Sequence, residues 1–203
     1  MKKSKLLISA VAAGIAIGIG GAVFLSLDNK IVGALFFSLG LLTVVSNGLA
    51  LFTGKVGYAP MNPVSYWVDL VVIWLGNYIG ATLTGLAFRL TRAQKAEKAL
   101  EIVNAKLGDG LISVFILSVF CGILMFLAVN GYKKIGDFGR YLILVLPVAV
   151  FILSGYEHCV ANMFYYAHAL VFSPKALLWL LVMTVGNSVG GILAGLYEKH
   201  MCK

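Results

Sequence analysis

Six long apolar stretches run along the chain and are separated by short polar segments. Since about 20 consecutive apolar residues span the hydrocarbon core of a bilayer as an α-helix, this pattern predicts an all-α membrane protein with six transmembrane helices. Five of the stretches contain no Asp, Glu, Lys or Arg, and they cover residues 6–27, 31–54, 70–88, 110–132 and 176–197. The remaining stretch, 141–172, is the fifth along the chain and is interrupted only by Glu157, His158 and His168.

The composition supports the same class. Of 203 residues, 61% are hydrophobic and 12% are charged, against about 25% charged in an ordinary soluble domain. A chain this short cannot bury so much apolar surface unless lipid covers part of it. The longest polar connection, about 89–109, is too short for a soluble domain, so we expect residues 1–203 to form a single transmembrane channel domain in the lipid bilayer.

The formal net charge is +8. In a membrane protein such charge mainly reports topology and headgroup contact, so we expect no nucleic-acid partner. If both termini are inside, nine basic residues fall on inner segments and seven on outer ones. This weak bias favours a multi-pass membrane protein with both termini inside.

No nucleophile–base–acid set and no Walker, zinc-ligand or haem spacing occurs in the sequence. Glu157 is the one acidic residue deep inside an apolar stretch. We therefore expect neither an enzyme nor a bound metal or cofactor.

The two halves of the chain carry related motifs. Each half contains three spans, an odd number, so the two halves insert with opposite orientation. We therefore predict inverted repeats over about 7–90 and 107–197. Transporters with such repeats place their sites near the bilayer midplane, where helices break. A shift of 110 positions gives these matches: Gly76-Asn77-Tyr78-Ile79-Gly80 on Gly186-Asn187-Ser188-Val189-Gly190, 51–53 on 161–163, and Gly48 on His158.

The second apolar stretch ends in residues that break helices, Thr53-Gly54-Lys55-Val56-Gly57-Tyr58-Ala59-Pro60. Glycine permits non-helical backbone, and proline cannot donate a hydrogen bond inside a helix. Irregular backbone at membrane depth is tolerated only against protein or water, which would place Thr53 at a broken helix end facing a lumen. A helix that simply ends at Thr53 is the alternative. We expect the fifth span, which carries Glu157 and His158, to be broken as well.

Glu157 and His158 are adjacent inside the apolar stretch 141–172. Ionisable residues at this depth cost about 2.5–3.5 kcal/mol on insertion scales and mark the paths of ions or protons. Because imidazole titrates near neutral pH, His158 is the leading candidate to exchange a proton with a small anion. The alternative is a buried histidine that stabilises a helix break. Glu157 lies about 100° round a helix from His158, so it need not face the same lumen. Its simplest role is to hold the broken helix or an adjacent protomer by hydrogen bonds.

Other residues are candidates for the path or its edges. Lys106 follows the polar connection, where it would draw anions toward a pore mouth or snorkel to the interface. His168 is near the end of its stretch and is expected at the interface. Apolar residues of the two broken spans are candidates for constrictions that exclude hydrated ions, namely Phe37, Leu41, Leu51, Phe52 and Phe151.

Two segments resemble the signatures of the formate/nitrite transporter family. Gly48-Leu49-Ala50-Leu51-Phe52-Thr53-Gly54 resembles the first signature. Ser154-Gly155-Tyr156-Glu157-His158-Cys159-Val160-Ala161-Asn162-Met163-Phe164 resembles the second, which is highly specific. The Gly-Asn pairs at 76–77 and 186–187 match as well. The resemblance extends over residues 7–197.

The resemblance implies an aquaporin-like six-helix protomer, a homopentamer and one permeation path per protomer. The family passes small monovalent weak-acid anions, often with a proton. Formate is the first candidate, with hydrosulfide and nitrite as alternatives. The resemblance places the central histidine at His158, the loop threonine at Thr53, the entrance lysine at Lys106 and constrictions at Phe37, Leu41, Leu51 and Phe151. Further candidate path residues are Glu157, Asn162, Asn77 and Asn187.

The sequence departs from the family pattern at two positions. Ala50 replaces a common acidic residue, and Gly122 replaces an asparagine of the formate channels. The Leu-Phe-Thr-Gly-Lys form of the loop looks closer to hydrosulfide-type and other short members, which leaves the substrate open.

Two other classes remain as alternatives. An aquaporin-type pore for neutral solutes would need paired Asn-Pro-Ala loops, but the one Asn-Pro pair is Asn62-Pro63. A purely structural membrane subunit would leave the Glu157-His158 pair unexplained.

Overall fold

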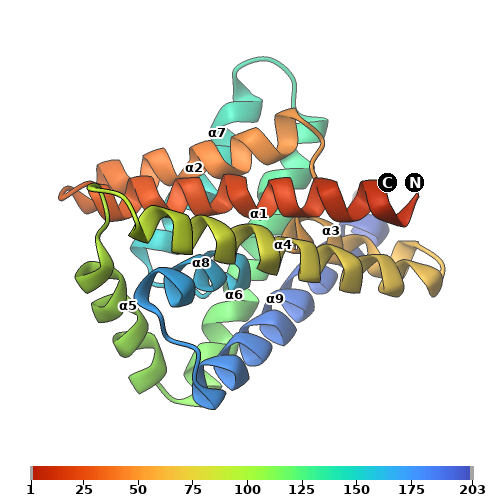
Figure 1. Ribbon diagram of the computed structural model, residues 1–203. Helices are drawn as coiled ribbons and strands as arrows, with labels where there is room; N and C mark the ends of the chain where they lie inside the picture. The colour runs from red at the N-terminus through yellow and green to blue at the C-terminus, as the bar shows by residue number, and fades with distance from the viewer. Residues whose placement is uncertain (1, 202–203) are drawn as a thin grey trace.

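The computed structural model describes residues 2–201, which contain helices and loops but no strand (Figure 1). Both ends of the chain lie at one end of the molecule, which we call the terminal side, and α5 lies at the other end, the α5 side. The helices are α1 (Lys3–Ser26), α2 (Lys30–Ser46), α3 (Phe52–Lys55), the 3₁₀ helix η1 (Val56–Met61), α4 (Ser65–Arg89), α5 (Ala96–Gly108), α6 (Leu111–Lys134), α7 (Gly139–Leu153), α8 (Cys159–Ala169) and α9 (Pro174–Met201).

Four helices, α1, α4, α6 and α9, are long and apolar enough to cross a membrane. The other two predicted spans each contain more than one helix. α2 ends at Ser46 and α3 begins at Phe52, while α7 ends at Leu153 and α8 begins at Cys159. The all-α class is confirmed for the described residues, and the six-span organisation stays a prediction.

The long helices pack in two matching groups. α1 packs along α2 and α4, and α6 packs along α7 and α9. Figure 1 shows α1 lying between α2 and α4. α8 contacts α4 and α9, and η1 contacts α9, so the short helices join the two groups. Trp74 of α4 donates from Nε1 to Thr184 Oγ1 of α9 at 3.0 Å, a bond between residues 110 positions apart.

Glycines allow the paired helices to approach each other closely. A Cβ atom on Gly80 would lie 2.1 Å from the Val11 carbonyl oxygen, and one on Gly190 would lie 1.9 Å from that of Val119. Both distances are far inside van der Waals contact. Small residues at such positions let helices pack tightly without a hydrophobic driving force, as they must in lipid.

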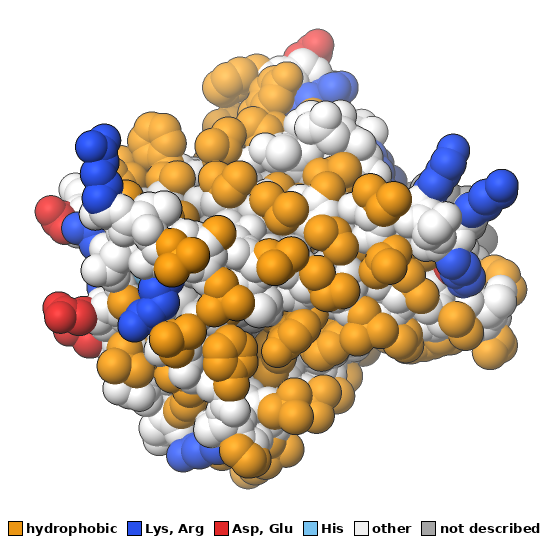
Figure 2. All heavy atoms as spheres, in the orientation of Figure 1, with side chains coloured by type: hydrophobic (Ala, Val, Ile, Leu, Met, Phe, Trp, Pro, Cys, Tyr) orange, Lys and Arg blue, Asp and Glu red, His pale blue; other side chains and the backbone are white. Residues whose placement is uncertain are grey.

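Apolar side chains cover much of the face drawn in Figure 2, and charged side chains gather toward its edges. On α4 the exposed apolar residues recur at helical spacing: Val68, Val71, Leu75, Ile79 and Leu83. Monomeric soluble proteins rarely expose such extensive apolar surface. This surface suits contact with lipid or with other copies of the chain.

The structure corrects part of the predicted repeat. Gly48 and Gly155 both have left-handed backbone, with φ of 62° and 70°. Leu49 N donates to Val44 O, and Tyr156 N donates to Phe151 O, each at 2.8 Å. The non-helical segments of the two halves therefore match at a shift that is three positions smaller than the shift of 110 that aligns Asn77 with Asn187. Gly48 corresponds to Gly155 and not to His158, because the two halves differ in length before their third long helix.

We expect Gly190→Ala to destabilise the protein by about 1–3 kcal/mol, since the added methyl group forces α9 away from α6. Thermal unfolding of the detergent-solubilised protein would measure the effect. Gly110→Ala is the matched control, because a Cβ there meets nothing within 4 Å. Equal melting temperatures for the two variants would contradict this account of the packing.

Candidate functional site

Thr53 and His158 meet in the protein interior, where α3 and α8 begin. Thr53 Oγ1 and His158 Nε2 lie 2.9 Å apart, and the residues are 0% and 2% exposed. His158 caps the N-terminus of α8, and its Nδ1 accepts from the Ala161 backbone N–H at 3.0 Å. Because Nδ1 is an acceptor, the proton of the neutral ring is on Nε2, which donates to Thr53. Thr53 keeps its own hydroxyl proton available for another partner.

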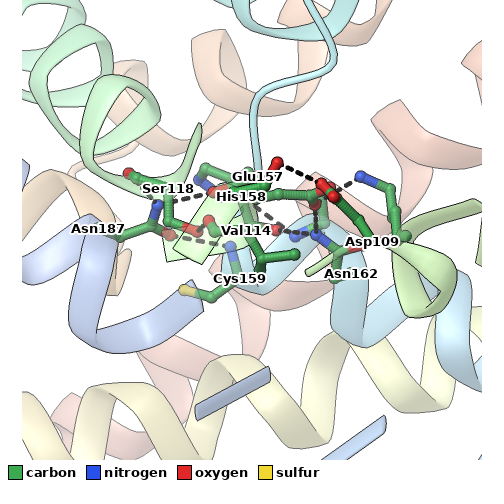
Figure 3. Close-up of polar contacts among 11 residues, drawn as sticks. Asp109, Val114, Ser118, Glu157, His158, Cys159, Asn162 and Asn187 are labelled. Carbon is green, nitrogen blue, oxygen red and sulfur yellow. Dashed lines mark hydrogen bonds and ion pairs between the residues drawn. The ribbon is translucent and has the colours of Figure 1, made fainter. Parts of the chain in front are cut away.

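Two asparagines hold the non-helical segments that precede these residues. The Asn77 side chain accepts from Phe52 N at 2.8 Å and donates to Ala10 O and Ala50 O at 2.8 and 2.9 Å. Asn187 does the same in the second half, as Figure 3 shows: it accepts from Cys159 N and donates to Ser118 O and Glu157 O. Both residues are 0% exposed.

This arrangement changes the expected role of the two asparagines. Asn77 and Asn187 do not line either of the two cavities described below. Their amide groups are occupied by backbone partners on three sides. We therefore place them in the support of the site and not in its predicted path.

Apolar side chains surround the Thr53–His158 pair. The five residues predicted as constrictions are all buried: Phe37, Leu41, Leu51, Phe52 and Phe151. The Phe37 and Phe151 rings meet edge to face with centroids 5.7 Å apart, and Phe151 stacks on the His158 ring at 5.6 Å. Phe151 lines the cavity on the α5 side and Leu51 the cavity on the terminal side. Their role as constrictions stays a prediction.

The α5-side cavity has a volume of about 380 Å³ and reaches His158. Lys106 Nζ donates to Glu157 Oε2 at 2.5 Å, and Asn162 Nδ2 donates to the same oxygen at 2.9 Å. All three of these residues line the cavity. Asn162 Oδ1 is buried and has no hydrogen-bond partner among the described residues, so it keeps its capacity to accept a hydrogen bond.

Glu157 lines the cavity and also bonds to the broken helix through Asn162 of α8. The helical-wheel argument does not apply, because residues 156–158 are outside α7 and α8. Glu157 is 3% exposed, and it lines the same cavity as His158 while bonding to Lys106. Lys106 is therefore a neutralised partner, not a free cation at a pore mouth.

His168, which we expect at the interface, is 0% exposed and therefore buried within the protein. Its Nδ1 lies 3.0 Å from Gly85 O, and its Nε2 accepts from Lys95 N at 3.1 Å. It connects α8 to the end of α4 and the start of α5. The sequence carries no signal for this burial, and the interfacial position stays a prediction.

A second cavity of about 260 Å³ lies on the terminal side. Its lining includes Lys55, Lys133 and Arg140. None of the three was singled out as a functional candidate, because each comes at the end of an apolar stretch, where basic residues usually report topology. Within residues 2–201, no group of three or more His, Cys, Asp or Glu side chains is placed to hold a metal ion.

A buried polar pair between two cavities, within a bundle of apolar helices, is the architecture of a membrane channel or transporter. A family model described as Formate/nitrite transporter matches residues 1–198. This chain belongs to the formate/nitrite transporter family, which confirms the resemblance seen in its signatures.

Curated relatives include both formate and nitrite transporters. The formate channel FocA of Escherichia coli (strain K12) is 31% identical over 205 residues, covering 82% of this chain and 72% of FocA. The nitrite transporter NirC of Salmonella typhimurium is 26% identical over 214 residues, covering 92% of this chain and 78% of NirC.

Two solved structures share the fold. An FNT family ion channel superposes with a TM-score of 0.88 at 24% identity, covering 98% of this chain and 90% of that one. A pentameric formate channel with formate bound superposes with a TM-score of 0.77 at 27% identity, covering 98% and 95%.

We expect Glu157→Gln to lower the free energy of unfolding by about 3 kcal/mol, because it leaves the Lys106 ammonium group without its buried partner. Adding Lys106→Met should recover about 1–3 kcal/mol, the coupling expected of residues in contact. Thermal unfolding of the four proteins of this cycle would measure it. Lys30→Met, in the same cavity but exposed, is the control and should add to Glu157→Gln independently. A purely additive Lys106–Glu157 cycle would count against the pair.

Proposed function

We propose that this protein is a channel or proton-linked facilitator for small monovalent anions of weak acids, with formate as the first candidate. The observation that carries the proposal is the Thr53–His158 hydrogen bond, 2.9 Å long, buried between two cavities and enclosed by apolar side chains. Hydrosulfide and nitrite are the alternatives, and the NirC relative supports nitrite. Membership of a transporter family supports transport and not an enzymatic reaction.

The buried apolar residues Phe37, Leu41, Leu51 and Phe151, which we call the apolar layer, make a weak acid the natural substrate. Moving a bare carboxylate-sized anion into a low-dielectric environment costs on the order of 20 kcal/mol by the idealised Born estimate. The neutral acid avoids most of this cost. Phe37, Leu41, Leu51 and Phe151, which are all buried, would therefore favour passage of the anion together with a proton.

The hydrogen bonds of His158 suggest how the proton travels. A second ring proton would have to occupy Nδ1, which accepts from the Ala161 amide. Proton exchange through His158, as expected from the sequence, would break that bond. We therefore propose that His158 stays neutral and orients Thr53. The acid takes its proton from water in one cavity and releases it in the other.

The Thr53 hydroxyl group then becomes the main polar contact inside the apolar layer. It accepts from His158 and can donate to a carboxylate or acid carbonyl oxygen in the path. Asn162 Oδ1, which lacks a partner among the described residues, can accept from the hydroxyl group of a protonated acid on the α5 side.

The same proposal extends to topology and assembly. We propose six spans in two inverted repeats, with α2–α3 and α7–α8 as broken spans, in a plasma-membrane protein with cytoplasmic termini. We also propose a homopentamer with one path per protomer. The pentameric state of the formate channel and the exposed apolar face of α4 support this assembly.

Purified protein in liposomes should accelerate formate uptake, and uptake should rise as the external pH falls. His158→Ala should lower the rate about tenfold, the kinetic equivalent of one lost hydrogen bond. The remaining flux should keep its pH dependence, because the acid carries the proton. Stopped-flow measurements against protein-free vesicles and the exposed-residue control His200→Ala would test this. An unchanged rate would rule out a role for His158, and a lost pH dependence would assign the proton to it.

The hydroxyl group of Thr53 can be tested separately. Thr53→Val keeps the shape of the side chain but removes the donor, so formate flux should fall about tenfold. Thr53→Ser should retain most of the flux. Thr43→Val is the matched control, because the Thr43 hydroxyl donates only to Leu39 O in its own helix. Equal flux in wild type and Thr53→Val would remove Thr53 from the path.

A further inference from the structure

His168 is a buried ionisable residue for which the proposed path has no use. It lies in the last turn of α8 and is 0% exposed. Its side chain lines neither the α5-side cavity nor the terminal-side cavity. Burying a polar side chain costs free energy unless its hydrogen bonds are made, so the role of this histidine must lie in the bonds that it makes.

Backbone groups of two other elements occupy both ring nitrogens of His168. Nδ1 lies 3.0 Å from Gly85 O of α4, and Nε2 accepts from the Lys95 N–H at 3.1 Å. Since a carbonyl oxygen can only accept, the ring proton is on Nδ1. The Phe164 and Phe88 rings lie against the imidazole, with centroids 5.7 and 5.0 Å away. The surroundings therefore select one neutral tautomer of a ring that is fixed in place.

α5 is bonded to the segment containing α8 at both of its ends. Lys95 immediately precedes α5, and its N–H bonds to His168 in the last turn of α8. Lys106, in the last turn of α5, bonds to Glu157, which lies just before α8 begins. The two helices also pack on each other, so they are held antiparallel with one hydrogen bond at each end.

The position of α5 determines part of the α5-side cavity, because this helix supplies three lining residues: Ile102, Ala105 and Lys106. A further attachment is made in the first turn of α5, where Lys98 Nζ donates to Leu25 O and Leu27 O at 3.0 and 2.7 Å. Of the three attachments of α5, only the one at His168 depends on an imidazole, the side chain that ordinarily titrates near neutral pH.

The charged groups nearest the His168 ring come from α4 and α5 and are mostly basic. Arg89 Nη1 of α4 donates to the His168 carbonyl oxygen at 2.9 Å, and Lys95 and Lys98 lie at the start of α5. Glu97, in the first turn of α5, is exposed, and in the described part of the chain no carboxylate pairs with His168. A second ring proton would have to occupy Nε2, where it would face the Lys95 N–H and break that bond.

We propose that His168 is a positioning residue for the α5-side cavity and acts through α5. As a neutral ring it fixes the start of α5 on α8, and with it the cavity wall that carries Lys106. Protonation of Nε2 releases the start of α5 from α8 and leaves the helix attached through Lys98 and Lys106. The inference rests on the proposed transport function and adds a residue that adjusts how the substrate enters from the α5 side.

Two amide variants separate the two ring bonds, because the glutamine amide reaches the place of Nε2 and the asparagine amide that of Nδ1. His168→Gln keeps an acceptor for the Lys95 N–H and does not titrate, whereas His168→Asn keeps only a donor for Gly85 O. Both lose the ring, so their difference reports the Lys95 bond. In formate exchange across liposomes at about pH 7.5 on both sides, half-saturation should need about fivefold more formate in His168→Asn than in His168→Gln, the equivalent of one hydrogen bond. The maximal rates should differ less, because Thr53 and His158 are intact.

The pH profile distinguishes this role from a purely structural one. Between about pH 7.5 and about pH 5, the half-saturating formate concentration of wild type relative to His168→Gln should rise about fivefold, because only the wild-type side chain titrates. The ratio cancels the protonation of formate itself. His200→Gln removes an exposed histidine and is the control, since its ratio to wild type should stay constant. Equal values for the two amide variants, or a wild-type ratio that does not change with pH, would overturn the proposal.

Hydrogen exchange keeps this inference distinct from the proposed function, because it needs no transport. In solubilised protein, peptides that contain Lys95 should exchange equally in wild type and His168→Gln at about pH 7.5. At about pH 5 the Lys95 amide should exchange about fivefold faster in wild type, where its acceptor is lost. If wild type does not transport formate, the proposed function fails and the exchange rates still test His168. If formate is transported but the two exchange rates agree at both pH values, the role of His168 alone is overturned.

Discussion

The whole site depends on the hydrogen bonds that Asn77 and Asn187 make to non-helical backbone. Lipid offers no hydrogen-bond partners, so interrupted helices are possible only where protein or water satisfies the freed amide and carbonyl groups. Each asparagine accepts from the backbone N–H at the start of a short helix and donates to the backbone carbonyl two residues before it. These bonds fix where α3 and α8 begin, and hence where Thr53 and His158 meet.

The ionisable groups near the α5-side cavity are also paired. Glu157 and Lys106 are both placed at the α5-side cavity, but each cancels the other. His158 Nδ1 accepts from the Ala161 amide, which favours the neutral ring. The buried apolar residues are therefore flanked by polar groups without carrying a net charge of their own, which suits the weak-acid substrate proposed above.

The long helices and the family could be predicted from the sequence, because apolar length and the Gly-Asn motifs are local signals. The Glu157–His158 pair marked the site for the same reason. The detailed match between the halves could not be predicted: a constant shift pairs Gly48 with His158, whereas backbone conformation pairs it with Gly155. The Lys106–Glu157 pair depends on α5 packing against α8, and the gathering of Lys55, Lys133 and Arg140 at one cavity depends on α3, α6 and α7 meeting there. Such long-range packing leaves no trace in local composition. Asn77 and Asn187 are predicted path residues, and only their contacts reveal that they support the backbone.

The Trp74–Thr184 hydrogen bond has a consequence for the symmetry between the two halves. In an arrangement with two-fold symmetry, a residue can touch its own counterpart only next to the axis. Trp74 and Thr184 are counterparts under the shift that aligns the Gly-Asn motifs, and they touch. In a dimer of identical three-helix units, one residue type would have to serve as both donor and acceptor there. Within a single chain that requirement is absent, so an indole donor on α4 faces a hydroxyl acceptor on α9.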